Sequence, residues 1–242
     1  MIDIHTHILP LVDDGSKSME LSRKLLIDAR NDGITDICLT PHFCRMDNFI
    51  LKKDIITQKF ESFKNQVKDI DIKLYLGNEL MIESNLDELL ETKQLCTLNN
   101  SDYVLIEFPF NEYKNDYNEY LYNISLIGLK IIIAHPERYQ FINDKLIHSW
   151  LSNGYYLQAN ALSFNVKEKR KFLFNLIENG QLHLIASDAH SEHRPSILSD
   201  TYELIAHKFN IETADLLFNI NPYNILNNKN IIKPSKVRKR LF

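Results

Sequence analysis

Short runs rich in β-branched and aliphatic residues alternate with longer amphipathic stretches along the whole chain. This alternation is typical of repeated βα units around a parallel sheet, and it disfavours separate layers of sheet and helix. Seven strands are expected, namely Met1–Ile4, Ile34–Leu39, Ile72–Leu76, Tyr103–Phe108, Lys130–Ala134, Tyr155–Gln158 and Leu182–Ala186. Each precedes an expected helix, and the helices lie near residues 18–32, 54–69, 84–92, 115–128, 144–153, 165–180 and 199–218.

Polar residues interrupt this pattern where the expected strands end. In a parallel β/α barrel such positions converge on the C-terminal mouth, where active sites lie. An open doubly wound sheet would gather them less completely, so we expect an α/β fold of the distorted (β/α)7 TIM-like barrel type. The polar residues are His5, His7, His42, Glu79, Glu107, His135, Asn160, Asp188 and His190, with Asp13 and Asp14 in the first loop.

The length of 242 residues corresponds to fewer than two domains of ordinary size, and no linker rich in Gly, Ser or Pro divides the chain. We expect a single domain over residues 1–242 that ends in a basic tail, KPSKVRKRLF, from about residue 233. This tail is either a solvated end of the chain or a docking segment for an acidic partner or the inner membrane surface.

Composition excludes several classes of protein. A net charge of −4 and a pI of about 6.1 provide no broad cationic field for nucleic acid or anionic lipid. The chain begins with no signal-peptide pattern and contains no apolar membrane span. The three cysteines form no CxxC pair and head no C-x5-R loop, which excludes a disulfide framework and a cysteine-dependent phosphatase. We therefore expect a cytoplasmic protein without nucleic-acid binding or stable membrane insertion, and no oligomeric state is predicted.

The polar cluster has the composition of a metal centre. Any one of its histidines alone is more simply a hydrogen-bonded strand-end residue, but chance does not readily place them all on one rim. Imidazole and carboxylate ligands without thiolate suit Mn²⁺, Fe²⁺ or Zn²⁺, and the set exceeds what one ion takes from protein, so two or three ions are expected. Ions about 3.5–4 Å apart can hold a nucleophilic hydroxide between them while they neutralise a phosphate, which favours phosphate ester hydrolysis.

Two arginines follow the expected fifth and seventh strands. Arg138 lies in AHPER and Arg194 in HSEHRP, and both can make bidentate contacts to phosphoryl oxygens. The simpler interpretation is a surface ion pair, such as one between Arg138 and Glu137.

The segments MIDIHTHILPLVDDG, TPHF, GNE, LIEF, AHPERY and ASDAH, between Met1 and about Pro195, resemble the motifs of the polymerase and histidinol phosphatase superfamily. The resemblance is closest to the manganese-dependent tyrosine phosphatases of bacterial capsule and exopolysaccharide operons. It implies a distorted (β/α)7 barrel with a three-metal cluster, most simply of Mn²⁺, with Fe²⁺, Zn²⁺, Mg²⁺ or Co²⁺ as alternatives. The implied ligand sets are His5, His7, Glu79 and Asp188 for one ion, Glu79, Glu107 and His135 for a second, and Asp14, His42 and His190 for a third. The implied catalytic residues are Arg138 and Arg194, which match the phosphate-binding arginines, together with His42.

The chain departs from that family at Leu11, where a small or flexible residue, commonly glycine, is expected. Spacing alone does not decide between Asp13 and Asp14, so the assignment of Asp14 rests on the resemblance. Four further histidines are expected to have structural or solvent-exposed positions, namely His148, His183, His193 and His207.

Tyrosyl phosphate suits such a site, because its phenolate leaving group, with a pKa near about 10, needs little help from a general acid. The resemblance implies that the substrate is the phosphotyrosine-containing C-terminal tail of a bacterial tyrosine kinase that controls capsule or exopolysaccharide synthesis. Tyr113 and Tyr117, in the loop 110–118, either line the mouth of the site or are ordinary surface aromatics.

Three other functions compete with this one. The first keeps the site but acts on a small phosphate monoester such as histidinol phosphate, or on a phosphodiester. The second is an amidohydrolase-type barrel, against which the fourth strand ends in Glu107 and offers no lysine for a carbamylated bridge. The third is a catalytically silent binding module, which would be expected to have lost ligands, and none is lost.

Overall fold

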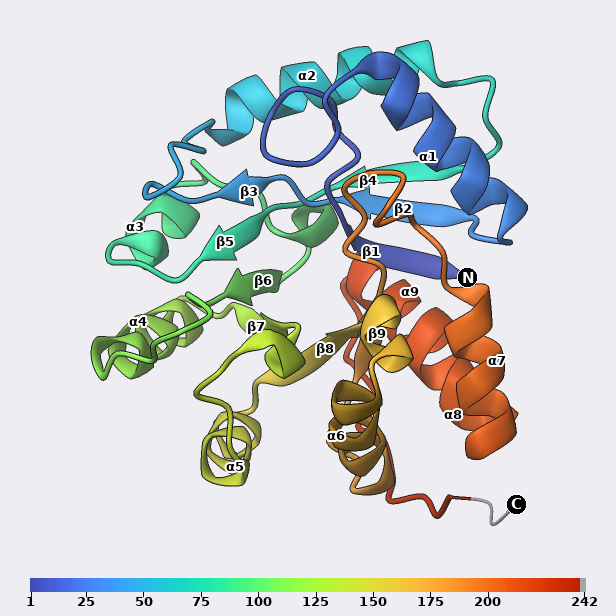
Figure 1. Cartoon of the computed structure of the whole chain (residues 1–242). Coiled ribbons are helices and arrows are strands. Elements are labelled where there is room, and N and C mark those ends of the chain that lie inside the picture. Colours follow the sequence, from blue (N-terminus) through green and yellow to red (C-terminus); the bar gives the residue numbers. More distant parts are fainter. Residues whose placement is uncertain (240–242) are drawn as a thin grey trace.

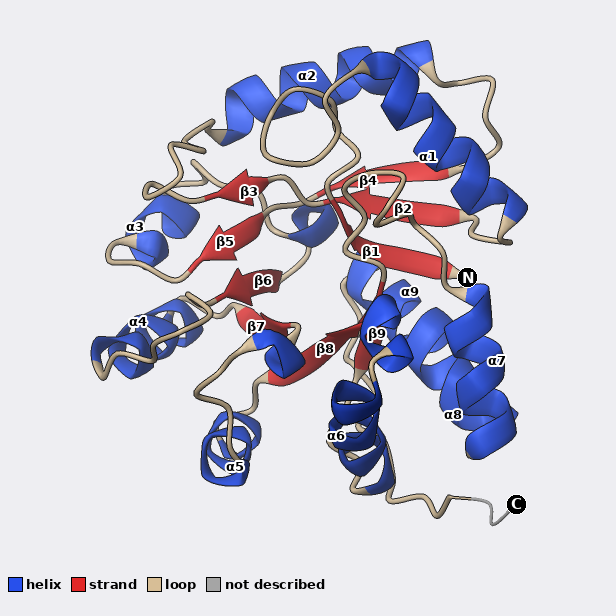
Figure 2. Ribbon diagram, in the orientation of Figure 1, coloured by secondary structure: helices blue, strands red, loops and turns tan. Residues whose placement is uncertain are grey.

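The computed structural model describes residues 1–239 and consists of parallel strands, most of them followed by a helix (Figures 1 and 2). The strands are β1 (Ile2–Thr6), β2 (Asp36–Leu39), β3 (His42–Phe43), β4 (Lys73–Leu76), β5 (Glu79–Met81), β6 (Tyr103–Glu107), β7 (Lys130–Ala134), β8 (Tyr156–Asn160) and β9 (Leu184–Ala186). The α-helices are α1 (Met19–Asn31), α2 (Lys53–Gln66), α3 (Leu86–Glu91), α4 (Asp116–Leu126), α5 (Asp144–Ser152), α6 (Lys167–Glu178), α7 (Ser199–Lys208), α8 (Ile211–Asp215) and α9 (Asn221–Leu226). The short helical turns are η1 (Leu98–Asn100), η2 (Pro136–Arg138), η3 (Ala161–Asn165) and the π-turn η4 (Leu216–Ile220).

The strands form two parallel sheets, β1-β2-β4 and β3-β5-β6-β7-β8-β9. β3 continues the line of β2 after a break at Pro41, which has no N–H to donate. β5 continues β4 after a break at Gly77, where an added Cβ would lie 2.7 Å from the Leu98 side chain. The two sheets therefore supply seven strand positions around one ring.

Backbone hydrogen bonds join the first and last strands of this ring. The Asp188 N–H donates to the His5 carbonyl at 2.9 Å, and the His7 N–H donates to the Ala189 carbonyl at 2.7 Å. We call these two bonds the seam. They confirm the expected fold, a distorted barrel of seven βα units.

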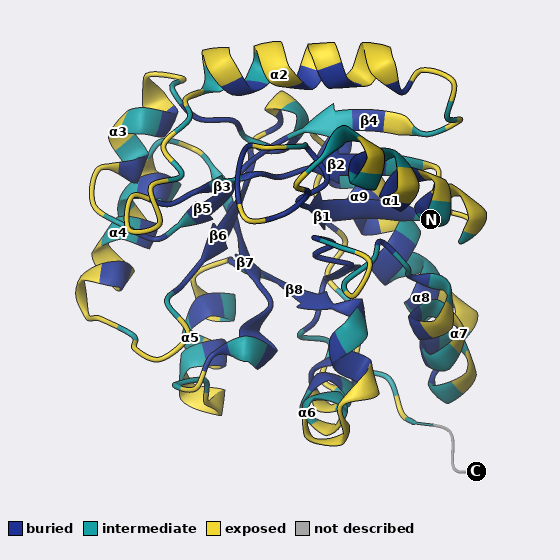
Figure 3. Ribbon diagram, turned by 45° about the horizontal axis from the view of Figure 1, so that its top comes forward, coloured by how far each residue is buried: buried dark blue, intermediate teal, exposed yellow. Residues whose placement is uncertain are grey.

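Strand side chains alternate between the barrel interior and the layer beneath the helices. On β6, Leu105 packs in an inner cluster, whereas Val104 and Ile106 pack in the outer one. This alternation follows from the two-residue period of a strand, and burial on both faces explains why the strands read as continuous apolar runs. Ile225 and Leu226 belong to the inner cluster, so the segment around α9 packs against the strand residues of the barrel interior. Figure 3 shows buried strands surrounded by helices whose exposed residues face outward.

The expected strands and the first six expected helices are confirmed to within a few residues. The helix expected over 199–218 is instead divided into α7, α8 and the start of η4. His42 and Glu79, expected after their strands, lie inside β3 and β5, because parallel pairing resumes beyond each break. No helix among residues 1–239 has the length and apolar character required to cross a bilayer.

Part of the basic tail lies against α6. The Val237 N–H donates to the Glu178 carbonyl at 3.1 Å, the Lys239 ammonium pairs with the Glu178 carboxylate, and Lys239 also lies over the Phe174 ring at 5.7 Å. The remaining tail residues, 240–242, lie outside the described part of the chain.

Candidate functional site

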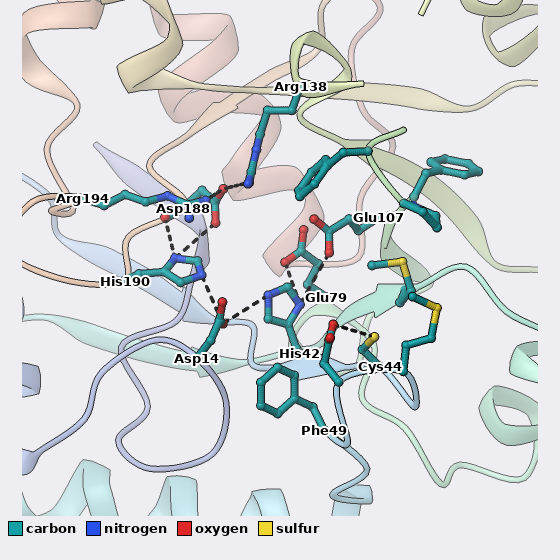
Figure 4. Close-up of a pocket in the computed structure, with 16 residues that line it drawn as sticks. Asp14, His42, Cys44, Phe49, Glu79, Glu107, Arg138, Asp188, His190 and Arg194 are labelled. Atoms are coloured by element: carbon teal, nitrogen blue, oxygen red, sulfur yellow. Dashed lines mark hydrogen bonds and ion pairs between the residues drawn. The ribbon is translucent and has the colours of Figure 1, made fainter. Parts of the chain in front are cut away.

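The nine residues expected to hold metal converge at the C-terminal mouth of the barrel. Figure 4 shows those that line the cavity, namely Asp14, His42, Glu79, Glu107, Asp188 and His190. Three groups have potential ligand atoms within 4.8 Å of one another: His5, His7, Glu79 and Asp188; His42, Glu79 and Glu107; and His7, Asp14, His42 and His190. The first group has the expected members, and the third gains His7. The second contains His42 where His135 was expected, but His135 Nε2 lies 3.0 Å from Glu79 Oε1 and 3.5 Å from Glu107 Oε1.

The histidines of β1 direct two ring nitrogens at one point. His5 Nε2 lies 3.2 Å from His7 Nε2, and each is 3.1 Å from Glu79 Oε2. On the far side of the rings, His5 Nδ1 contacts Gln158 Oε1 at 2.9 Å, and His7 Nδ1 contacts Asp13 Oδ2 at 2.7 Å. Because these oxygens accept a hydrogen bond from Nδ1, the Nε2 atoms of both rings are turned inward. Burial lowers the pKa of His7, but Asp13 and Glu79 outweigh it and raise that pKa to about 10, so two nitrogens this close require either a proton or a cation between them.

Glu79 belongs to two of the three groups and contacts two histidines of the third. Its Oε2 contacts His5, His7 and His42, and its Oε1 faces His135. Burial by itself raises the pKa of Glu79, but the surrounding imidazoles outweigh it and lower that pKa. Burial and the Glu79 charge raise the pKa of Glu107, so these two carboxylates oppose each other's ionisation in the absence of a cation.

Several buried atoms of this cluster have no hydrogen bond within the described chain. His42 Nδ1, His135 Nδ1 and Asp188 Oδ1 are buried and have no hydrogen bond. Burial lowers the pKa of His42 to about 4 and that of His135 to about 3, so both imidazoles are neutral near pH 7. Neutral imidazoles and carboxylates with free lone pairs fit divalent cations of the Mn²⁺, Fe²⁺ and Zn²⁺ type.

Asp13 and Asp14 have different surroundings. Asp13 is buried and accepts hydrogen bonds from His7, from the His42 backbone and from the Gly15 backbone. Asp14 is 56% exposed, and its Oδ1 lies 3.5 Å from His42 Nε2 and 3.4 Å from His190 Nε2. Asp14 therefore faces the cluster, while Asp13 orients a ring that belongs to it.

Arg138 and Arg194 meet on one carboxylate oxygen. Arg138 Nη1 donates to Asp188 Oδ2 at 3.0 Å, and Arg194 pairs with the same atom. The interpretation of Arg138 as a surface partner of Glu137 is wrong, because Glu137 is buried and accepts from the Asn160 backbone at 2.9 Å. Both arginines remain partly exposed, so each has donors left for an anion.

Two cluster residues have the left-handed backbone conformation that side chains rarely adopt. The φ angles of His135 and Asp188 are 30° and 57°. Such strain is retained where surrounding structure over-determines it, and it occurs most often at functional sites. Asn160 steadies Asp188 by donating to its Oδ2 at 2.6 Å.

A cavity of about 540 Å³ opens over the cluster and the two arginines. Its opposite side is apolar: Phe49 stacks on His42 with ring centroids 5.9 Å apart, and Phe110 lies beneath the Arg138 guanidinium at 4.3 Å. The apolar side is formed by Cys44, Met46, Phe49, Met81, Phe108, Pro109 and Phe110, which we call the apolar wall.

Both interpretations of Tyr113 and Tyr117 are wrong. They line no part of this cavity and are not ordinary surface residues, because they pack against Phe108, with centroids 5.4 and 5.6 Å away. Tyr117 is only 5% exposed.

Sequence reasoning missed the polar residues that support the cluster from within the barrel. Asp3 is fully buried and accepts from the Ser187 backbone and the Ser196 hydroxyl, and Gln158 contacts His5. The available signal is a polar residue inside an expected strand, before the strand ends, as at Asp3 and Gln158. His183, expected to be structural, is buried and accepts from the Leu157 N–H at 3.2 Å, whereas His148 and His193 are exposed.

Comparison with known proteins agrees with this geometry. A family model described as capsular polysaccharide synthesis, CpsB/CapC, matches residues 1–227. The chain belongs to the CpsB/CapC family. The resemblance inferred from the sequence motifs is thereby confirmed.

Members of the CpsB/CapC family match nearly the whole chain. CapC of Staphylococcus aureus is 37% identical over 215 residues, which cover 84% of this chain and 82% of CapC. The tyrosine-protein phosphatase CpsB of Streptococcus agalactiae serotype V is 34% identical over 241 residues, covering 94% and 99% of the two chains. A crystal structure from work on YwqE of Bacillus subtilis and CpsB of Streptococcus pneumoniae, described as unique metal-dependent tyrosine phosphatases, matches with a TM-score of 0.90 and 28% identity over both full chains.

Proposed function

We propose that this chain is a metal-dependent protein-tyrosine phosphatase of capsular or exopolysaccharide synthesis. The observation that carries the proposal is the placement of Arg138 and Arg194, both on Asp188, beside three groups of imidazoles and carboxylates. Similarity to proteins named tyrosine-protein phosphatases supports it.

The proposed ligands are His5, His7, Asp14, His42, Glu79, Glu107, His135, Asp188 and His190, with Glu79 shared between ions. We propose two or three divalent ions, with Mn²⁺ as the native metal. Bound ions of this kind supply a nucleophile from water and neutralise phosphate charge.

The residues of the chain have defined tasks in this proposal. The guanidinium groups of Arg138 and Arg194 hold phosphoryl oxygens and orient phosphorus toward the ligand cluster. His42, neutral and at the edge of the cavity, has one nitrogen facing Asp14 and the other facing Glu79 and Glu107, which fixes the ring between the two groups. Asp188 holds both arginines in place, so its carboxylate couples the phosphate-binding groups to the ligand cluster.

The apolar wall favours an aryl phosphate over an alkyl phosphate. Phe110 presents aromatic surface beside Arg138 and Phe49 does so beside His42, and the phenyl ring of phosphotyrosine would lie along this wall. The good phenolate leaving group fits a site in which no residue is assigned as general acid.

We further propose that the substrate is the phosphotyrosine-containing tail of a bacterial tyrosine kinase, and that the protein acts in the cytoplasm. The open cavity admits a side chain on a flexible peptide. We also propose one domain for the chain, because a single buried apolar cluster includes residues from Ile8 to Phe218.

The test uses protein stripped with EDTA and then supplied with Mn²⁺, Mg²⁺, Zn²⁺ or Fe²⁺. Hydrolysis of para-nitrophenyl phosphate, a phosphotyrosyl peptide, histidinol phosphate and a phosphodiester is measured, and metal content is counted by mass spectrometry. We expect restored turnover of the two aryl phosphates and at least tenfold less on histidinol phosphate. Bound metal with turnover of histidinol phosphate alone would refute the tyrosine phosphatase.

Arg138→Lys and Arg194→Lys test the arginines without removing charge. Because lysine lacks the bidentate fork, each should raise KM or lower kcat for the phosphotyrosyl peptide about tenfold or more, with the metal content unchanged. Arg23→Lys, at an exposed ion pair with Asp69, is the matched control and should leave turnover unaltered.

A further inference from the structure

A second cavity adjoins the candidate site on the other side of its two arginines. It has a volume of about 330 Å³ and shares Arg138 and Arg194 with the first. The rest of its lining comes from the loop after β8, the start of α6 and the loop after β9: Asn160, Leu162, Ser163, Val166, Lys169, Ser187 and His193.

The charged side chains that line this second cavity are all cationic. Arg138, Lys169 and Arg194 are cationic, and no carboxylate lines the cavity. Glu137, beneath the lining, is buried; its carboxylate accepts from the Asn160 N–H and from the Ser163 side chain, and it interacts electrostatically with Lys169. Asp188, the partner of both arginines, lines the first cavity and not this one.

Lys169 differs from the other lysines of its helix. It is half-buried at the cavity, whereas Lys167 and Lys171 are exposed and line no part of it. The N-terminus of α6 lies at the same cavity through its cap residue Val166, and no side chain caps it. The positive end of the helix dipole therefore adds to the field of Lys169.

From this we infer that the second cavity binds another anionic group of the substrate peptide, a carboxylate or a second phosphoryl group near the scissile phosphotyrosine. This inference rests on the proposed phosphatase function and specifies its substrate class. The guanidinium groups stand between the two cavities, so they can donate to an anion on either side. At about 3.3 Å per residue, an extended peptide brings a group one to three positions away from the phosphotyrosine within reach of an adjoining cavity.

The test compares three peptides that share one phosphotyrosine and differ in the flanking residues: neutral, glutamate, or a second phosphotyrosine. Each is also made with phosphonomethyl-phenylalanine in place of the scissile phosphotyrosine, so that binding is measured without turnover. The protein is the full chain loaded with Mn²⁺. The glutamate and second-phosphotyrosine arms separate the two sources of negative charge.

We expect the wild type to bind and hydrolyse the acidic peptides about three to ten times better than the neutral one, with a preference that declines as salt is added. Lys169→Glu should abolish the preference, Lys169→Arg should retain it, and turnover of para-nitrophenyl phosphate should be unchanged in both. Lys171→Glu makes the same charge change on the same helix outside the cavity and should have no effect. His193→Glu supplies an independent variant on another loop and should also reduce the preference.

Equal binding of acidic and neutral peptides by the wild type would overturn the inference, and so would an equal loss in Lys171→Glu. Because the phosphonate peptides are not hydrolysed, their binding is measured independently of the proposed phosphatase activity. If para-nitrophenyl phosphate is not hydrolysed but the acidic peptides still bind preferentially through Lys169, the proposed phosphatase function is wrong and the anion subsite is supported.

Discussion

Asp13 holds His7 by a 2.7 Å hydrogen bond from Nδ1, and the same carboxylate accepts from the backbone of His42 and Gly15. One buried side chain thus sets the orientation of two residues in the cluster. An asparagine there would have only one acceptor oxygen for three donors.

We therefore expect Asp13→Asn to weaken metal binding about 10- to 100-fold while the fold is retained. The measurement is metal content after dialysis against a graded chelator, with circular dichroism as the check on folding. Asp32→Asn is the control. The Asp32 carboxylate lies outside the cluster and likewise accepts from backbone N–H groups, those of Leu198 and Ser199. Unchanged metal affinity in Asp13→Asn would show that His7 is oriented by other contacts.

Glu107→Ala and His135→Ala should each lower phosphatase turnover about 100-fold or more without unfolding the protein. The fold should be retained in Glu107→Ala, because the buried carboxylates of Glu107 and Glu79 oppose each other's ionisation when no cation is bound. Steady-state kinetics and thermal melting of the metal-free proteins check this. Activity near the wild-type value in either variant would remove that residue from the proposed centre.

The pH dependence of stability should include a contribution from His183, whose pKa is lowered by burial from 6.5 to about 4. Since the unfolded chain takes up a proton near pH 6.5 and the folded chain does not, stability is present above that pH and is lost as the pH falls toward 4. Between pH 7 and pH 5 the loss should be about 2 kcal/mol.

Urea unfolding of the wild type and of His183→Gln at both pH values isolates this contribution. The variant should be less stable at pH 7 but should lose about 2 kcal/mol less on acidification. If the free energy of unfolding fell equally in the two proteins, the pKa of His183 would be the same in the folded and the unfolded chain.

Leu11 has a φ of 60° and is 67% exposed, in the position where the related phosphatases are expected to have glycine. A leucine in the left-handed region destabilises the fold by about 1–2 kcal/mol. A glycine there avoids this strain but costs about 0.5–1 kcal/mol, because its unfolded chain has more conformational freedom to lose. Leu11→Gly should therefore raise the free energy of unfolding by up to about 1 kcal/mol, whereas Leu11→Val should lower it. Denaturant titration at fixed metal concentration decides, and a destabilised glycine variant would contradict the assigned strain.

Truncation after Pro234 should leave turnover of para-nitrophenyl phosphate within about twofold, because the tail contacts α6 and not the cavity. The lost hydrogen bond of Val237 and the contacts of Lys239 should lower stability by about 1–2 kcal/mol. Loss of turnover at a temperature where the truncated protein remains folded would show that the tail is required for activity.

The strands and the rim residues were predictable for the same reason. A parallel strand buried on both faces reads as an apolar run, as in Lys130–Ala134, and the first polar residue beyond it marks the mouth of a barrel. The packing of Tyr113 and Tyr117 was not predictable, because it depends on how the loop folds back onto Phe108 and, for Tyr113, on Trp150 of the distant helix α5. The same holds for the joint contact of Arg138 and Arg194 on Asp188, since spacing along the chain carries no information about which oxygen both reach.

The seam also has a consequence for how the protein is made. His5 and His7 leave the ribosome well before Asp188 and Ala189, which bond to their backbones and follow more than 180 residues later. At a synthesis rate of about 5–20 residues per second, the first strand waits about 10 seconds or longer for its last neighbour. The metal-binding rim is therefore completed only once residue 190 has been synthesised, and the nascent chain carries its first two imidazoles until then without a barrel that can enclose an ion.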